Sequence, residues 1–115
     1  MVKVSNTTDD SVTLSDGTVI TSDHNQECCE HHYLDFSQVS LEDFDGLIFD
    51  VSSDTFFEAV ADYGIRLVPT NGHPVSIPGY GYNNGYYSTN LTLVLSKPGS
   101  DNRTFDITEC QDIKD

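Results

Sequence analysis

The sequence is 115 residues long, which suits a single domain with one hydrophobic core, and 37% of its residues are hydrophobic. Its formal net charge of −14 disfavours direct binding to nucleic acid or to an anionic membrane, because those surfaces are also negative. No apolar run approaches the length of about eighteen residues that a membrane span needs, and no signal-peptide pattern follows the first residues, so we expect a soluble, intracellular protein.

A β-hairpin is predicted near the N-terminus. Two β-prone runs, residues 11–15 and 18–22, flank Asp16-Gly17, a dipeptide that favours tight hairpin turns. In the first run Val12 and Leu14 alternate with polar residues, as they do in a half-buried strand.

Residues 23–36 contain three histidines, two adjacent cysteines and four acids. On a helix, four of these side chains would share one side and could bind zinc: His24, Cys28, His31 and His32. On a strand, neither face gathers four ligands. A cysteine nucleophile with a histidine base is disfavoured, because acidic surroundings raise the pKa of a thiol. The remaining interpretation is structural, with Cys28 or Cys29 as a small buried residue, no cofactor, and histidines that are exposed or hydrogen-bonded.

The segment 41–50 lies in the most acidic part of the chain. Residues 1–65 hold fourteen acids and one base, a formal charge of −13. Because the acids are interspersed with apolar residues, we expect them on a folded surface and not in a disordered tail. The residues that we assign to partner binding here are Glu42, Asp43, Asp45 and Asp50. Residues 47–51 are predicted to be a short strand.

One helix is predicted, at about residues 54–63. Ser53 or Asp54 can cap its start, and Gly64 is placed to end it. Three residues follow at i, i+4 and i+7, the spacing of one helical face: Phe56, Val60 and Tyr63.

The rest of the chain is predicted to be strands. Residues 65–70 and 73–78 flank the turn dipeptide Asn71-Gly72, and residues 86–96 alternate well enough to form a strand. Residues 103–107 are predicted to be the last strand. The fold class is therefore α+β, a strand-rich, mainly antiparallel sheet of hairpins packed by one helix, in a single domain of residues 1–115.

Residues 79–87 are rich in Tyr, Asn and Gly. Tyrosine offers a large, rigid contact area with a polar tip, which suits partner recognition. Alternatively, the segment is a structural hairpin whose Gly and Asn residues supply the turn. The residues that we assign to partner binding here are Tyr80, Tyr82, Asn83, Asn84 and Tyr86.

Two elements resemble a family of small proteins carried by phages and prophages. They are His24 with the run Glu27, Cys28, Cys29 and Glu30, and the distal hairpin Asn84, Gly85, Tyr86, Tyr87 and Ser88. The resemblance implies a phage-type accessory protein in the cytoplasm of a bacterial host, and it brings no enzymatic activity with it.

Two functions are compatible with these features. The first is a non-enzymatic inhibitor that occupies a basic, nucleic-acid-binding surface of a host defence or DNA-processing protein, as anti-CRISPR proteins and DNA mimics do. Carboxylates two residues apart on a strand are about 6–7 Å apart, so an acidic sheet face can imitate a row of phosphates. The second is a metal-binding or small-ligand-binding module centred on residues 24–32.

Overall fold

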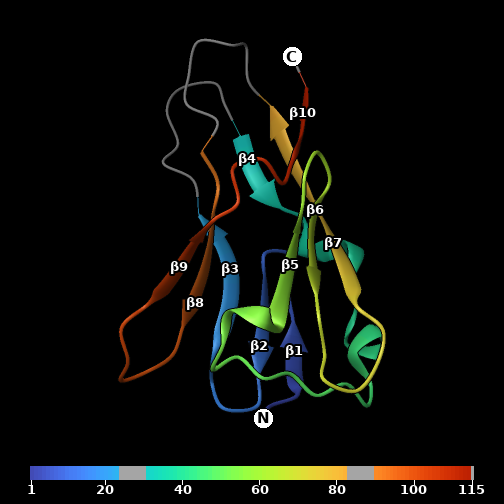
Figure 1. Ribbon diagram of the computed structural model, residues 1–115, viewed down its shortest axis with the longest axis vertical. Helices are drawn as coiled ribbons and strands as arrows, with labels where there is room; N and C mark the ends of the chain where they lie inside the picture. The colour runs from blue at the N-terminus through green and yellow to red at the C-terminus, as the bar shows by residue number, and fades with distance from the viewer. Residues whose placement is uncertain (24–30, 83–89, 115) are drawn as a thin grey trace.

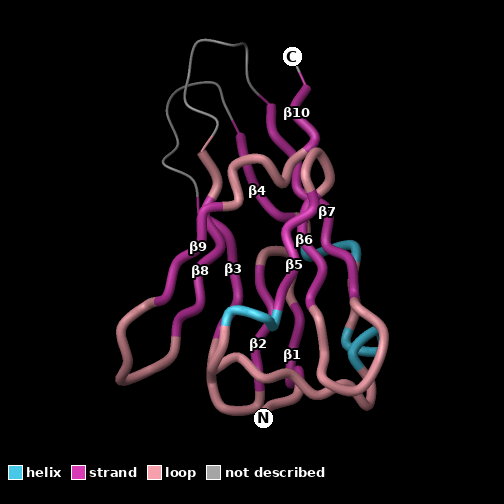
Figure 2. The backbone as a smooth tube through the Cα atoms, in the orientation of Figure 1, coloured by secondary structure: helices cyan, strands magenta, loops and turns pink. Residues whose placement is uncertain are grey.

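The computed structural model describes residues 1–23, 31–82 and 90–114. Within these ranges the chain forms strands and three short 3-10 helices, and it has no α-helix (Figures 1 and 2). The strands are β1 (Val4–Thr7), β2 (Ser11–Leu14), β3 (Val19–Asp23), β4 (His31–Leu34), β5 (Phe57–Val60), β6 (Gly64–Leu67), β7 (Val75–Tyr82), β8 (Thr92–Ser96), β9 (Arg103–Asp106) and β10 (Asp112–Lys114). The 3-10 helices are η1 (Phe36–Gln38), η2 (Leu41–Phe44) and η3 (Asp54–Phe56).

The strands form two sheets. The first sheet has the order β1-β2-β3-β8-β9, and every neighbouring pair in it is antiparallel. In the second sheet the long strand β7 pairs with β6 through its first half, and β6 pairs with β5. The second half of β7 pairs with β4, antiparallel, and with β10, parallel. The strand β7 is therefore central to the second sheet, because β4, β6 and β10 all pair with it.

One hydrophobic cluster takes side chains from both sheets. The strands supply alternate residues, which point to one face: Val12, Leu14, Ile20, Leu93 and Leu95 from the first sheet, and Leu34, Ile65, Leu67 and Ile77 from the second. Each 3-10 helix adds one buried phenylalanine, namely Phe36, Phe44 or Phe56. The short helices thus act as anchors that fix loops onto the core.

Several strand predictions are confirmed. The N-terminal hairpin forms as β2 and β3, and Gly17 in its turn has a φ of 91°, a conformation that glycine adopts without strain. The alternation in residues 86–96 also holds among its described members, because Leu91, Leu93 and Leu95 are all buried. The mainly antiparallel pairing is likewise as expected.

The α+β prediction is wrong, because residues 54–63 do not form an α-helix. Ser53 does cap a helical turn, but η3 ends at Phe56 and the chain continues directly as β5. This strand pairs antiparallel with β6, and Asp62 in the connecting turn has a φ of 63°. The observed fold is thus mostly β, with two sheets in place of one sheet packed by a helix.

Aromatic packing explains why the strand is preferred over the helix. Phe56 and Phe57 both lie against Phe105 of β9, with ring centroids 5.7 and 5.1 Å away. Phe57 contacts Phe105 from β5, and a helix that continued through residue 57 would lose the pairing of β5 with β6, so the ring contact and the strand pairing support each other. The pattern of Phe56, Val60 and Tyr63 is therefore coincidental, and Tyr63 is exposed.

Two strand boundaries also differ from the prediction. Residues 47–51 form no strand, and only an isolated bridge joins Phe49 to Val2. The last strand is β10, whereas β9, at residues 103–106, is an edge strand of the first sheet. In the described ranges, no helix has the length and apolar character needed to cross a lipid bilayer.

Candidate functional site

The four acids assigned to partner binding lie on and beside η2. Glu42 and Asp43 belong to η2, and Asp45 follows it. Phe44 and Phe49, which precede Asp45 and Asp50 in the chain, pack edge to face with centroids 6.2 Å apart. The two chain segments that carry the acids are therefore adjacent. We call Glu42, Asp43, Asp45 and Asp50 the acidic surface.

Asn71 holds the loop that carries this surface. Its side-chain Nδ2 donates to the Gly46 carbonyl at 2.9 Å, and its Oδ1 accepts from the Ile48 amide, also at 2.9 Å. The turn between β6 and β7 is thereby tied to the loop after η2. The loop has a defined conformation before any partner arrives, which reduces the entropy that binding would cost.

The four acids divide into two kinds. Asp43 accepts a hydrogen bond from the Ser40 amide at 2.8 Å and so stabilises the start of η2. Asp50 accepts from the hydroxyl and the amide of Ser52, and these hydrogen bonds lower the pKa of its carboxyl. Glu42 and Asp45 are exposed, and no described residue hydrogen-bonds to their carboxylates. These two are therefore the acids best placed to meet a partner.

Three of the five Lys and Arg side chains form ion pairs with described acids elsewhere on the fold. Ion pairs join Arg66 to Glu58 at 2.9 Å, Lys97 to Asp16 at 3.5 Å and Arg103 to Asp54 at 3.0 Å. Because each pair cancels its own charges, none of these three cations offsets the acidic surface.

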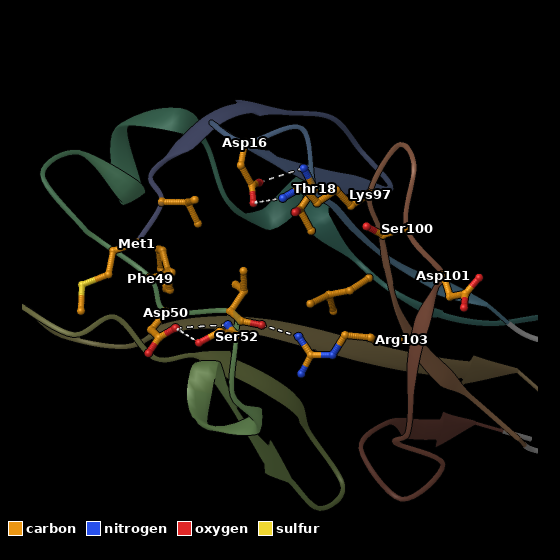
Figure 3. A pocket seen from close by; sticks show the side chains of 13 residues that line it. Met1, Asp16, Thr18, Phe49, Asp50, Ser52, Lys97, Ser100, Asp101 and Arg103 are labelled. Atoms are coloured by element: carbon orange, nitrogen blue, oxygen red, sulfur yellow. Dashed lines mark hydrogen bonds and ion pairs between the residues drawn. The ribbon is translucent and has the colours of Figure 1, made fainter.

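A pocket of about 350 Å³ opens where the β2–β3 turn, the segment after Phe49 and the β8–β9 hairpin meet (Figure 3). Its polar lining groups are largely bonded to one another. Asp16 accepts from the Thr18 amide and pairs with Lys97, while Arg103 donates to the Val51 carbonyl. We assign this pocket no ligand, because Asp16 and Lys97 pair with each other and Arg103 is held by the Val51 carbonyl and by Asp54.

One of the two assigned tyrosines within β7 has an aromatic neighbour that the sequence did not reveal. Tyr80 pairs with Tyr33 of β4, and their ring centroids are 5.9 Å apart. Tyr82 is the last residue of β7, whereas Asn83, Asn84 and Tyr86 lie outside the described residues. Tyr33 could have been found only by predicting a strand at residues 31–34, because alternation then places it on the face opposite His32 and Leu34, which are both buried.

The proposed zinc ligands are only partly within the described residues. His24 and Cys28 lie outside them, and His31 and His32 are consecutive residues of β4, so the helical spacing does not form there. His32 is buried, and its Nδ1 lies 2.7 Å from Oε1 of Gln111. Within the described ranges, no three potential ligands are grouped around a common point. Zinc binding stays a prediction.

The Gln111 side chain also fixes which nitrogen of His32 carries a proton. Nε2 of Gln111 donates to the Thr108 carbonyl at 2.7 Å, so Oε1 is the atom that faces the imidazole. An amide oxygen can only accept, and Nδ1 of His32 is therefore the donor. This contact makes His32 a hydrogen-bonded core residue.

The two elements of the phage-type resemblance are bordered by strand ends that pair with one another. Residues 24–30 and 83–89 are outside the described residues. Asp23, which precedes residues 24–30, pairs with Thr92, and His31, which follows them, pairs with Tyr82, which precedes residues 83–89. The fold thus joins both elements to neighbouring strands, although they are far apart in the sequence.

Fold and site together define a two-sheet β protein with a conformationally fixed, exposed acidic surface. The chain belongs to the family described as a domain of unknown function, DUF7448, whose family model matches residues 1–93. The match spans β1 to β7 and reaches into β8, so it includes the acidic surface. Comparison with curated proteins and with solved structures found no match.

Proposed function

We propose that this protein binds a basic partner protein through its acidic surface and inhibits it by occupying a surface that otherwise binds nucleic acid. The distribution of charge on the fold is the observation that carries the proposal. Residues 1–65 hold fourteen acids against one base, and Glu42, Asp43 and Asp45 of the acidic surface are exposed. No catalytic residue is needed for such a role.

The fixed conformation of the acidic surface favours binding to a preformed basic surface. Phe44 anchors η2 in the core, and Asn71 holds the following loop, so the carboxylates are presented without a large ordering cost. Lys and Arg residues that contact phosphates would meet carboxylates on this surface instead. Long-range attraction between the two proteins would also raise the association rate.

The phage-type resemblance suggests what kind of partner this is. A phage accessory protein acts inside a bacterial host, in the cytoplasm, where defence and DNA-processing proteins expose basic surfaces for nucleic acid. An acidic protein that covers such a surface works as anti-CRISPR proteins and DNA mimics do. We therefore place the partner among host proteins that bind nucleic acid.

Competition with DNA tests this proposal. The protein is immobilised to capture partners from a bacterial host lysate, and each captured protein is purified and titrated against it. We expect duplex DNA to displace the complex and rising salt to weaken it steeply, because the screening length falls from about 10 Å at 0.1 M to about 3 Å at 1 M. A complex that resists both DNA and salt would contradict the proposal.

Paired charge variants locate the contact. Glu42→Gln with Asp45→Asn removes two charges from the acidic surface, and Asp9→Asn with Asp101→Asn removes two from exposed turns elsewhere. The first pair should weaken binding about fivefold to tenfold and the second about twofold or less, since direct charge contacts exceed long-range effects. Equal losses would show that only net charge matters.

A further inference from the structure

Two tyrosines lie side by side on the outward face of the second sheet. Tyr33 and Tyr80 are register partners, and their rings are tilted by 49° with centroids 5.9 Å apart. Tyr33 is 46% exposed and Tyr80 is half-buried. Because consecutive residues of a strand point to opposite faces and His32 and Leu34 are buried, the face that carries Tyr33 is the solvent face.

Strand register and chain spacing place two carboxylates on the face that carries the tyrosine pair. Asp112 of β10 is the register partner of Tyr80 and is exposed, so Tyr33, Tyr80 and Asp112 cross three neighbouring strands spaced about 4.8 Å apart. Asp35 follows Tyr33 by two residues in extended backbone, with φ −95° and ψ 90°, a spacing that returns to the same side. We call Asp35, Tyr33, Tyr80 and Asp112 the tyrosine row.

Both carboxylates add negative charge beside the rings. Hydrogen bonds from Ser37 and Gln38 lower the pKa of Asp35, so this group is ionised at neutral pH and contributes its negative charge although both of its oxygens already accept hydrogen bonds. An aromatic face attracts a cation through its quadrupole, and a carboxylate attracts it through charge. A planar guanidinium can use both at once, because it stacks on the ring while its N–H groups point sideways at the carboxylate.

The protein itself contains an example of this combination. The guanidinium carbon of Arg103 lies 5.5 Å from the ring centroid of Phe105, and Nη2 of the same side chain is 3.0 Å from the Asp54 carboxylate. An arginine can thus stack on a ring and pair with an acid in this fold. In the tyrosine row this protein supplies the ring and the acid, and a partner protein would supply the arginine.

We propose that the tyrosine row binds an arginine side chain of a basic partner protein. The inference rests on the proposed function, since it names a second contact of the same partner on the second sheet. It also makes the interaction selective, because lysine is a compact and strongly hydrated point charge that gains less from stacking. The row therefore distinguishes arginine-rich from lysine-rich surfaces of equal charge.

Two synthetic peptides test the proposal, one with six arginines and one with six lysines, each spaced by glycine. Isothermal titration at moderate salt should show about fivefold tighter binding of the arginine peptide to the wild type. Tyr33→Leu should abolish that preference and leave the lysine peptide unaffected, whereas Tyr33→Phe should retain the preference because the ring remains. Since Tyr33 is exposed, neither substitution should disturb folding.

Tyr63→Leu is the matched control, because Tyr63 is 44% exposed but belongs to the turn between β5 and β6. It should leave the arginine preference unchanged. A preference that survives in Tyr33→Leu would overturn the tyrosine row, and so would equal binding of the two peptides by the wild type. In both cases salt-sensitive binding of the peptides would still support the proposed function. If the wild type bound neither peptide, both proposals would fail together.

Discussion

Four aspartates show that part of the acidity of this chain is structural. Each accepts a hydrogen bond from the backbone N–H of a Ser or Thr two residues later: Asp16 from Thr18, Asp35 from Ser37, Asp50 from Ser52 and Asp106 from Thr108. In three of them the hydroxyl of that residue donates as well, and this bond is the main reason that the pKa is lowered. In Asp16 partial burial raises the pKa, but the bonds from Thr18 and the charge of Lys97 together outweigh it.

These aspartates predict a loss of stability in acid. A carboxyl whose pKa is lower in the folded state stabilises the fold above its ordinary value of 3.8, and that contribution is lost as the pH falls through the folded value. The free energy of unfolding, measured in urea, should therefore drop as the pH falls from about 4 to about 3. Asp35→Asn and Asp106→Asn keep an acceptor oxygen but cannot titrate, so each should show a smaller drop.

Asp101→Asn provides the control for this experiment, because Asp101 is exposed and is not followed by Ser or Thr at the second position. It should lose as much stability in acid as the wild type does. If Asp35→Asn and Asp106→Asn behaved in the same way as this control, the hydrogen bonds from Ser37 and Thr108 would not be the source of the acid sensitivity.

Among the elements, the close approach of β6 to β7 depends on one glycine. A Cβ atom added to Gly64 would lie 2.1 Å from the Ile77 carbonyl oxygen and 2.7 Å from the Gly79 nitrogen. Both are backbone atoms of β7, which cannot move without disturbing the sheet. By contrast, a Cβ atom added to Gly72 would lie 2.6 Å from the end of the Leu47 side chain, which can rotate away.

Gly64→Ala and Gly72→Ala should therefore differ in stability although they are chemically the same change. We expect Gly64→Ala to lower the free energy of unfolding by about 3 kcal/mol or more, and Gly72→Ala to lower it by less than about 1 kcal/mol. Urea unfolding curves with matching slopes give the comparison. Equal, small losses would mean that β6 can move away from β7 more easily than the register suggests.

The elements that could be predicted from sequence are those specified by local residues. Asp16-Gly17 determines a hairpin by turn chemistry alone, and the alternation of Leu91, Leu93 and Leu95 identifies the buried face of one segment. The prediction of a helix at residues 54–63 was wrong because the contacts that favour a strand there are not local. Contact with Phe105, which lies about fifty residues later in the chain, favours the strand.

The same distinction between local and long-range information applies to the candidate site. Charge counting leads directly to the acidic surface, because composition needs no tertiary information. The tyrosine row could not be predicted as a whole, since it depends on the pairing of β4 with β7 and on the parallel pairing of β10 with β7. No residue pattern within β4 indicates that Asp112 will lie two strands away from Tyr33.

At the scale of the whole molecule, repulsion and ion pairing oppose each other. The net charge is −14, and the three ion pairs join side chains that are mostly well exposed, for example Arg103 at 38% and Asp54 at 78%. Exposed pairs contribute about 0–1 kcal/mol each, and salt weakens them. Repulsion among the remaining acids acts over the whole surface, and salt weakens it too. The response of stability to salt shows which of the two is larger.

We expect repulsion to dominate, so the melting temperature should rise as sodium chloride increases from about 0.01 M to about 0.5 M, where the screening length falls well below 10 Å. Choline chloride should give a similar rise, because screening depends on ionic strength and not on a specific cation. Glu42→Gln with Asp45→Asn should start higher and rise less, since two unpaired charges are gone. A melting temperature that fell with salt would show instead that the ion pairs outweigh the repulsion.

The same range of salt should weaken binding to a basic partner. Folding and binding should therefore respond to salt in opposite directions, because like charges meet within the fold and opposite charges meet at the interface.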